Sequence, residues 1–432
     1  MKKILFLLLT GIIAFTSCKK DDGTSPFTPG ENNKDHPVIW TYNYGQSQTD
    51  ANTIPAMDEN GNIFFSIQDG EEPKTVYAFG IDKSGNPLWN KEYSGVNYCQ
   101  ITRAIYQSGK IFFYVTRADE LYNIEETIIC IDANSGTELW AYTPAFPSMH
   151  PIQSIAVTAE YVLIGAEWGL TNADSQELHY FDFSGNLIKS VEIENHLNPQ
   201  QISVVGQNMY LASINYGVDP SKLTIMKMDL QSNSIQWEFI PTEDYDHPFF
   251  SQRSLAIDKD GKVLFIYRSE FGVETNNLYI INDNGSLNQI ISSAAGNHET
   301  FDIIIDKDNN FYTASDEFGK YSSDGNSVWK FHHENSLPTA ATFRTGSIIG
   351  DNGYIYHAEA DGIVNSDAEG GLAWAKYKDG DFGRPGYPLL TEDGNVVVVG
   401  DQYVTCVKGD GAHIQNAPWP RVYCNNGNTS SR

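Results

Sequence analysis

The sequence predicts an all-β fold in which one small unit repeats around a ring, and three observations lead to it. An apolar strand, a turn and a second strand recur eight times, at residues 54–65, 104–112, 154–164, 202–211, 255–264, 303–312, 347–356 and 388–397. A strand, an Asp/Ser/Gly turn and a strand that often opens with Trp also recur eight times, at residues 76–89, 128–140, 178–188, 225–237, 278–287, 321–329, 363–374 and 404–411. The two patterns alternate strictly, and each returns after 40-odd to 50-odd residues.

Each pair of patterns supplies four short antiparallel strands, which at this period is typical of a propeller blade. No helical periodicity of useful length competes with this interpretation. A single blade cannot bury both of its faces, whereas a ring gives every blade two neighbours. We therefore predict one eight-bladed β-propeller of four-stranded antiparallel blades over residues 37–432.

Closure of the ring is predicted from a displaced strand near the start of the chain. Val38-Ile39-Trp40 matches the outer-strand pattern, and no blade precedes it. The last repeat ends at Gly411 without a Trp four residues later. We therefore expect residues 37–44 to form the outer strand of the blade whose other three strands lie within residues 387–408. Residues 412–432 should pack as an irregular closing segment, with the last few polar residues frayed.

The N-terminus has the pattern of a bacterial lipoprotein leader. Met1-Lys2-Lys3 is basic, and Ile4 to Phe15 is an apolar run of signal-peptide length that is too short to cross a bilayer. Phe15-Thr16-Ser17-Cys18 resembles a lipobox. We expect removal of residues 1–17 and lipidation of Cys18. An ordinary signal peptide followed by a chance Cys is the alternative.

The residues after Cys18 predict where in the cell the protein is located. Lys19-Lys20-Asp21-Asp22 resembles the export signal of Bacteroidota lipoproteins that reach the outer face of the outer membrane. Pro, Gly, Ser, Thr and Asn then dominate, so residues 18–36 are expected to be a flexible tether that begins at the lipidated Cys. We expect an outer-membrane lipoprotein exposed at the cell surface, and the periplasmic face is the alternative.

The charge excludes one class of partner. Asp and Glu number 55 against 28 Lys and Arg, which gives a net charge of −27. Nucleic acid is therefore not an expected partner, since phosphate contacts need a basic surface. Loss of residues 1–17 removes two lysines and no acidic residue, so the mature charge becomes −29. We expect a monomeric body for which an acidic polysaccharide is a poor ligand.

The repeats carry a family resemblance. Ile131-Asp-Ala-Asn-Ser-Gly-Thr-Glu-Leu-Trp140 and Ile81-Asp-Lys-Ser-Gly-Asn-Pro-Leu-Trp89 resemble the Ala-x-Asp…Gly-x-x-x-Trp repeat of pyrroloquinoline-quinone-like (PQQ-like) β-propellers. Ala417-Pro-Trp-Pro-Arg421 and Asn425-Asn-Gly-Asn-Thr429 resemble a segment that ends such chains. The resemblance implies the fold. It leaves the function open, because the scaffold serves quinoprotein dehydrogenases and also binding lipoproteins without a cofactor, such as the outer-membrane barrel-assembly lipoprotein.

The cysteines bear on the cofactor. In the dehydrogenases the quinone lies against a disulfide between adjacent cysteines, and Glu, Asn and Asp bind Ca²⁺. Here Cys99, Cys130, Cys406 and Cys424 are far apart in the sequence, so we expect neither PQQ nor Ca²⁺. A Cys406–Cys424 disulfide stays open, and four thiols that act as small hydrophobic residues are the favoured alternative.

Two further patterns raise the question of a metal. The acidic turns at residues 258–261 and 306–309 lack the spacing of a calcium loop, and Asp, Asn and Gly are what a tight hairpin requires. Histidines recur between blades, at His150, His196, His247, His298, His332 and His333. No spacing among them places two ligands together, so we expect no metal site.

Aromatic residues give the candidate ligand-binding face. An aromatic-Gly pair lies between the second and third strands of four consecutive blades, at Trp168, Tyr216, Phe271 and Phe318, and Tyr245 and Phe249 lie in a loop expected on the same face. Exposed aromatic rings flanked by carboxylates and amides suit a sugar ring or a partner's side chain. The alternative is that each ring caps its own blade.

These observations predict a non-catalytic lipoprotein that binds a glycan or a protein partner, or acts as a scaffold in the envelope. No Gly-x-Ser-x-Gly elbow, phosphate loop or Cys-x-x-Cys pair occurs in the sequence. The alternative is an enzyme on the same scaffold, either an atypical quinoprotein dehydrogenase or a polysaccharide-degrading enzyme.

Replacement of Trp168 and Phe271 together by Ala tests the aromatic face. If these rings contact the ligand, binding should be abolished while the melting temperature stays nearly unchanged. Calorimetric titration and thermal unfolding of the same variant provide the two readings. A large loss of thermal stability would instead favour the capping role.

Overall fold

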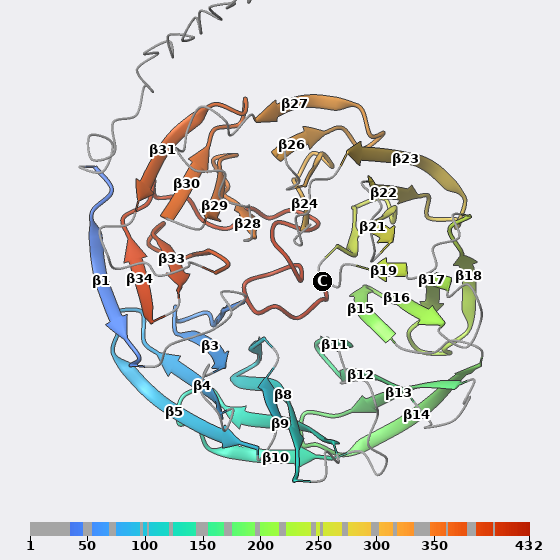
Figure 1. Ribbon diagram of the computed structural model, residues 1–432, viewed down its shortest axis with the longest axis horizontal. Helices are drawn as coiled ribbons and strands as arrows, with labels where there is room; N and C mark the ends of the chain where they lie inside the picture. The colour runs from blue at the N-terminus through green and yellow to red at the C-terminus, as the bar shows by residue number, and fades with distance from the viewer. Residues whose placement is uncertain are drawn as a thin grey trace, which may run out of the picture.

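The computed structural model describes residues 35–45, 54–68, 75–95, 98–101, 103–120, 124–143, 154–167, 175–194, 199–215, 222–242, 248–250, 254–269, 275–294, 302–313, 318–331, 346–359, 362–377, 386–400 and 402–432. These residues form eight antiparallel sheets arranged as blades around a central axis (Figure 1), which confirms the predicted propeller. Among them is no helix with the length and apolar character needed to cross a bilayer.

Blades 1 to 4 follow one another along the chain, each from the axis to the rim. Blade 1 contains β2 (Ala56–Met57), β3 (Ile63–Gln68), β4 (Thr75–Ile81) and β5 (Pro87–Ser94). Blade 2 contains β6 (Tyr98–Ile101) and β7 (Ile105–Gln107), which share the innermost position, then β8 (Lys110–Ala118), β9 (Ile124–Asp132) and β10 (Glu138–Tyr142). Blade 3 contains β11 (Ser154–Val157), β12 (Val162–Glu167), β13 (Ser175–Phe181) and β14 (Leu187–Glu194). Blade 4 contains β15 (Pro199–Val205), β16 (Asn208–Asn215), β17 (Lys222–Asp229) and β18 (Ile235–Phe239).

Blades 5 to 8 complete the ring. Blade 5 contains β19 (Pro248–Phe250) and β20 (Ala256–Ile257) side by side on β21 (Val263–Ser269), then β22 (Thr275–Ile281) and β23 (Leu287–Ala294). Blade 6 contains β24 (Ile303–Ile305), β25 (Phe311–Thr313), β26 (Phe318–Tyr321) and β27 (Ser327–Phe331). Blade 7 contains β28 (Ser347–Ile349), β29 (Ile355–Glu359), β30 (Gly362–Ser366) and β31 (Leu372–Tyr377). Blade 8 contains β32 (Leu389–Leu390), β33 (Val396–Val399), β34 (Tyr403–Val407) and, as its outer strand, β1 (Val38–Asn43).

The strand from the start of the chain closes the ring, as predicted. β1 pairs antiparallel with β34, and Trp40 lies opposite Cys406. In Figure 1 the blue β1 therefore lies beside the red β34. The hydrogen bonds between β1 and β34 thus join the N-terminal strand to the last three strands of the repeat and close the ring.

Short turns that contain Asp join inner strands in blades 1, 5 and 6, and the sequence explains their shape. The Asp58 carboxylate accepts hydrogen bonds from the backbone N–H groups of Asn60 and Asn62, at 2.9 and 2.8 Å. Gly61 adopts a φ of 81°, a region that residues with a Cβ rarely enter. Asp258 and Asp306 make the same two hydrogen bonds within their own turns. The acidic turns at residues 258–261 and 306–309 are therefore built like the other hairpins.

In most blades a Trp on the outer strand packs against the next blade and donates a hydrogen bond to it. Trp89 of blade 1 donates from Nε1 to the carbonyl of Ala133 in blade 2, at 2.7 Å. Its ring lies so close to Gly136 that a Cβ there would be 2.6 Å from the indole. Trp40, Trp140, Trp237 and Trp329 make the same type of hydrogen bond, at 2.8 to 3.1 Å. The Trp and Gly positions of the repeat thus encode the contact between blades.

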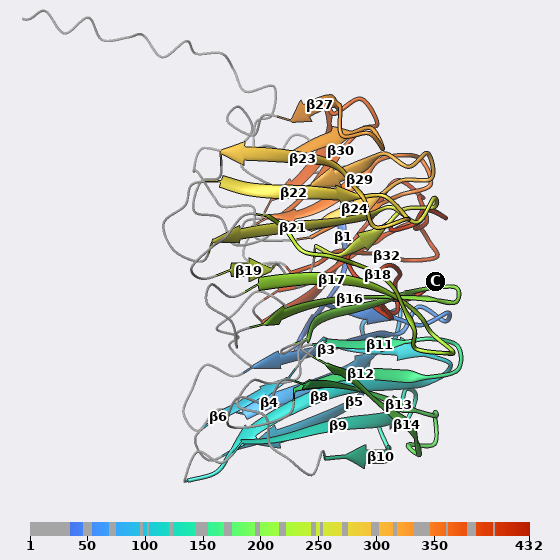
Figure 2. The same ribbon diagram turned by 90° about the vertical axis from the view of Figure 1, so that its right-hand side faces the viewer.

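The closing segment, residues 412–432, crosses the axis and contacts every blade. Its carbonyls accept hydrogen bonds from inner-strand N–H groups of blades 6, 7, 1, 2, 3 and 4, in the pairs Trp419–Ile305, Pro420–Ile349, Asn426–Met57, Gly427–Tyr106, Thr429–Val157 and Ser430–Val204, at 2.6 to 2.9 Å. Side chains reach the other two blades: Arg432 donates to the Asp258 carbonyl of blade 5, and Asn426 to the Leu390 carbonyl of blade 8. Seen from the side, the C-terminus lies toward one end of the blades (Figure 2).

The expectation that the last residues are frayed is wrong. Thr429 and Ser430 are buried, and the hydroxyl of Ser431 donates to the carbonyl of Val157. Both backbone groups of Arg432 are hydrogen-bonded, since its N–H donates to the carbonyl of Val204 and its carbonyl accepts from the N–H of Gly206. These polar residues are ordered because the inner strands offer them unpaired backbone groups.

Two buried side chains tie the closing segment to blades 1 and 2. The Asn428 amide donates to the carbonyls of Pro55 and Ala104, both at 3.0 Å, and accepts from the Arg421 guanidinium at 2.8 Å. Arg421 also donates to the carbonyl of Pro55. Burial lowers the pKa of Arg421 to about 9, so the group still carries its charge at neutral pH. The charge is satisfied by carbonyl oxygens at the centre of the ring.

We expect Asn428→Ala to lower the free energy of unfolding by about 2–4 kcal/mol, because it leaves buried carbonyls and the Arg421 guanidinium short of partners. Asn416→Ala is the matched control, since Asn416 is exposed in the same segment, and it should cost less than about 0.5 kcal/mol. Urea unfolding of both variants checks this. Equal effects would contradict the role given to Asn428.

Candidate functional site

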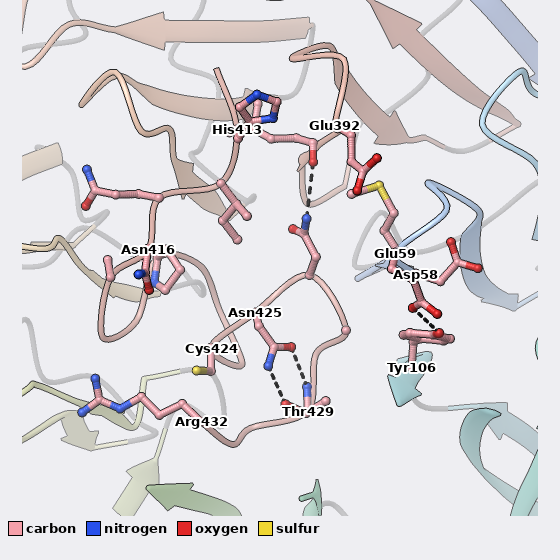
Figure 3. A pocket seen from close by; sticks show the side chains of 18 of the residues that line it. Asp58, Glu59, Tyr106, Glu392, His413, Asn416, Cys424, Asn425, Thr429 and Arg432 are labelled. Carbon is pink, nitrogen blue, oxygen red and sulfur yellow. Dashed lines mark hydrogen bonds between the residues drawn. The ribbon is translucent and has the colours of Figure 1, made fainter. Parts of the chain in front are cut away.

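A pocket of about 670 Å³ lies at the hub of the ring, and we call it the hub pocket. Figure 3 shows it from close by. Its walls come from the turns between the two innermost strands of blades 1, 2 and 8, and its floor is the closing segment. The lining residues are Met57, Asp58, Glu59, Tyr106, Gln107, Leu390, Thr391, Glu392, His413, Ile414, Gln415, Asn416, Ala417, Pro420, Cys424, Asn425, Asn426, Gly427, Thr429, Ser431 and Arg432.

The floor is held in shape by its own hydrogen bonds. The Asn425 amide donates to the hydroxyl of Thr429 at 2.7 Å, and its oxygen accepts from the Thr429 N–H at 3.3 Å. The same amide nitrogen also donates to the carbonyl of Ser431. Together with the bonds from the closing segment to the blades, these contacts give the pocket a fixed base.

One wall of the hub pocket is acidic. Asp58, Glu59 and Glu392 line it, and the latter two are exposed on adjacent blades. The Glu59 carboxylate accepts a hydrogen bond from the Tyr106 hydroxyl. Burial and this hydrogen bond raise the pKa of Tyr106 above its ordinary value, so the hydroxyl remains a donor at neutral pH. Glu392 is the carboxylate of this wall most open to a ligand, since no other side chain is hydrogen-bonded to it among the described residues.

The opposite side carries one guanidinium. Figure 3 places Arg432 across the pocket from Asp58 and Glu59. Arg432 Nη2 donates to the Asp258 carbonyl at 2.5 Å. Burial lowers its pKa relative to an exposed Arg. Amides of Asn416, Asn425 and Asn426 also line the pocket. The pocket therefore presents hydrogen-bond donors and acceptors of several kinds, with more negative than positive charge.

Two lining side chains with raised pKa values, Cys424 and Tyr106, are not activated as nucleophiles. Cys424 is buried and its thiol lies 3.7 Å from the carbonyl of Pro418. Burial raises the pKa of this thiol to about 12, so it is protonated at neutral pH and is a weak nucleophile. Tyr106 is held protonated as well. The polar groups of the pocket are thus arranged for hydrogen bonding.

Most of the aromatic face predicted from the sequence lies outside the described residues. This holds for Trp168, Tyr216, Tyr245 and Phe271, and also for Cys18 and the histidines from His150 to His333 named above. Phe249 lies in β19 opposite Arg268 in the strand register, and its side chain is not among those described. The contribution of these residues to binding therefore stays a prediction.

Phe318 corrects the prediction of an exposed ring. It begins β26, and its side chain is only 1% exposed. The ring packs edge-on against His357 of blade 7, at 4.3 Å between ring centroids, and beside Tyr312 of its own blade. The aromatic-Gly pattern placed Phe318 in a loop, whereas it lies in the strand and fills the space between two blades.

The cysteines do not form the quinone-binding arrangement that the family resemblance raises. Cys99, Cys130, Cys406 and Cys424 are all free and buried, so the open question of a Cys406–Cys424 disulfide is answered for this structure. The described residues also contain no group of three or more His, Cys, Asp or Glu side chains able to hold a metal ion. This donor set does not fit PQQ with Ca²⁺, and the absence of a cofactor remains a prediction.

The hub pocket itself was not predicted. Its wall residues are Asp, Glu, Asn and Thr in hairpin turns, which the sequence analysis explained by turn geometry alone. The Pro-Trp-Pro…Asn-Thr segment was the one feature of the sequence that could have indicated the pocket. A non-repeating stretch after the last blade can pack only at the axis or at the rim, and packing at the axis gives the pocket its floor.

No protein-family model matches the chain, and no curated protein matches it. Solved structures resemble it. A structure of the Dos1 propeller has a TM-score of 0.59 and 10% identity, over 88% of this chain and 97% of that one. The quinohemoprotein alcohol dehydrogenase from Comamonas testosteroni has a TM-score of 0.56 and 12% identity, over 87% and 77%. A europium-containing methanol dehydrogenase has a TM-score of 0.53 and 14% identity, over 86% of each chain. At these identities the likeness establishes the fold, a quinoprotein-like eight-bladed propeller.

Proposed function

We propose that this chain is a non-catalytic binding module of the cell envelope, anchored through a lipid on Cys18, and that the hub pocket binds a glycan. The observation that carries the proposal is the fixed floor of the pocket, because the closing segment is hydrogen-bonded to all eight blades. A preformed site loses little conformational freedom when a ligand binds. An eight-bladed ring is well suited to this, since its inner strands and turns converge on one point.

The lining indicates the class of glycan. Carboxylates and amides are the side chains that hydrogen-bond neighbouring hydroxyl groups, and Glu392 and Asn416 are exposed on the wall and floor. Three carboxylates against one guanidinium disfavour an anionic ligand. The net charge of the chain acts in the same direction. We infer a neutral or amino-bearing sugar as the ligand.

We also propose that a protein partner binds at the end of the blades opposite the hub pocket. The strand ends that flank Trp168, Tyr216 and Phe271 lie at the end of the blades away from the hub pocket, because antiparallel strands alternate their turns. We therefore propose a second contact surface there, independent of the sugar site. The Tyr106 hydroxyl and the Cys424 thiol at the hub are held protonated, so neither is an activated nucleophile.

A glycan-array screen of residues 23–432 followed by calorimetry tests the hub pocket. Glu392→Gln should weaken binding of the best glycan about 10- to 100-fold, because a hydrogen bond to a charged group is lost. Asp393→Asn is the matched control, since the neighbouring Asp393 is exposed in the same turn and does not line the pocket. If Glu392→Gln binds like the parent protein while the Trp168 and Phe271 double variant does not bind, the ligand occupies the aromatic face instead.

Cell fractionation tests the anchor. Cys18→Ser should move the full-length protein from the membrane fraction to the soluble fraction, because stable anchoring requires the acyl chains. Mass spectrometry of the parent protein should find a lipid-modified Cys18 as the first residue. Added protease should remove the body from intact cells if it faces outward, and protection from protease would place it in the periplasm. Unchanged membrane association of Cys18→Ser would contradict the lipid anchor.

A further inference from the structure

The contact between blades 3 and 4 departs from the repeated arrangement. On the outer strand of blade 3, Lys189 lies opposite Tyr180 directly after a β-bulge, and Trp140 occupies the same position opposite Cys130 in blade 2. In blade 4, Asn233 with a φ of 58° closes the turn onto Asp229, as Gly136 closes the turn onto Asp132. At this junction Lys189 therefore replaces the Trp of the repeated contact, and Asn233 replaces the Gly.

The exchanged pair makes a different set of contacts. Lys189 Nζ donates to the carbonyl of Gln231 and to the amide oxygen of Asn233, each at 3.3 Å, and it lies 4.1 Å from the centre of the Tyr180 ring. The Tyr180 hydroxyl donates to the same Asn233 oxygen at 2.6 Å. A lysine chain is narrower than an indole, so it fills less of the space between two blades.

A pocket of about 570 Å³ opens at this junction, and we call it the interblade pocket. Its walls include Tyr161, Ile188, Lys189, Leu230 and Gln231. Tyr161 stands edge-on to Tyr180, with 5.9 Å between ring centroids. The pocket therefore combines aromatic and aliphatic surface with a backbone carbonyl, the Gln231 oxygen, whose hydrogen bond from Lys189 is long.

The apolar part of the rim is Ile188, which lines the interblade pocket, with Leu187 next to it in the strand, while the exposed Glu160 and Gln207 line the pocket as well. Ile188 is the extra residue of the bulge and is 52% exposed, and the preceding Leu187 is 45% exposed. An aromatic anchor in a pocket with apolar contacts around it is the usual arrangement of a protein–protein hot spot. A small free ligand in the pocket would leave both rim residues uncovered.

We propose that the interblade pocket binds an aromatic side chain of a partner protein, with its ring against Tyr161 and Leu230 and its N–H or O–H directed to a backbone carbonyl of the blade 4 turn. The other junctions provide the precedent within this chain, because Trp40, Trp140 and Trp237 place an indole against the next blade with the same donor-to-carbonyl bond. The proposal does not depend on the hub pocket.

The test uses two probes on the soluble body: N-acetyltryptophanamide, and a seven-residue peptide with one central Trp flanked by Leu. For a ligand of this size in a well-formed pocket we expect the amide to bind with a Kd of about 1 mM, measured by ligand-observed NMR. The peptide should bind at least about fivefold more tightly, because it also covers Ile188 and Leu187. Equal affinities would show that the pocket takes a free ring and would overturn the protein partner.

The variant Lys189→Trp/Asn233→Gly restores the repeated contact and fills the pocket. It should fold with a melting temperature at or above that of the parent protein and lose binding of both probes by more than about tenfold. Gln289→Trp is the matched control, since Gln289 holds the Trp position at the junction of blades 5 and 6, against Gly325. Gln289→Trp should bind both probes like the parent.

A second pair of variants covers the case in which Lys189→Trp/Asn233→Gly does not fold. Ile188→Asp should weaken the peptide about tenfold, whereas Leu139→Asp should not, because Leu139 is the exposed bulge residue beside a junction that Trp140 already fills. Unchanged peptide binding by Ile188→Asp overturns the proposal. Saturable binding of methyl glucoside in place of the indole probe also overturns it, in favour of a second sugar site.

Discussion

The hydrogen bonds between the closing segment and the inner strands are the constraint on which the rest of the structure depends. In each blade the innermost strand has one edge facing the axis, and its N–H groups on that edge have no partner within the blade. A buried N–H without an acceptor is costly, so the axis must be filled by something that offers carbonyls. Residues 412–432 do so for six blades through their backbone. The path requires irregular backbone, and Tyr423, Asn428 and Ser430 adopt positive φ so that successive carbonyls face successive blades.

The rim is governed by a second repeated contact, which explains why some apolar residues stay exposed. Leu88 and Leu139 are the extra residues of bulges on the outer strands, and each directs the following Trp into the junction with the next blade. The bulge leaves the leucine in solvent, at 39% and 47% exposure. It also disrupts the free edge of the outer strand, which hinders pairing with another chain. The junction with Lys189 and Asn233 differs from this regular pattern: the bulge is present, but Lys189 takes the place of the Trp.

The sequence predicted those parts of the fold that repeat. A Trp and a Gly at fixed spacing encode both the strand register and the contact to the next blade, so the blades followed from the pattern, and Trp40 out of place identified β1 as the closing strand. The closing segment could be located but not described, because its partners are backbone groups that carry no sequence signal. Phe318 was misplaced for a related reason: the strand that begins at Phe318 is only four residues long, and a one-residue change at its start decides between a loop and a buried ring. The hub pocket draws residues from three blades and the closing segment, and only the assembled ring brings them together.

The point at which the chain enters the ring restricts what the two pockets can meet. His36 stacks on Trp374 and contacts the carbonyl of Lys408, so the entry point lies at the end of blade 8 from which the closing segment departs. Both pockets use residues of the closing segment, and they therefore open toward the same end of the blades as the entry point. With the proposed anchor at Cys18, an extended chain to His36 reaches at most about 60 Å. A body of this net charge would be repelled by an anionic bilayer, so in the proposed lipoprotein it would stay off the surface but within this distance. Under the proposed anchoring, a ligand for either pocket would have to be available in that layer, which favours glycans and proteins that are themselves part of the envelope over freely diffusing ones.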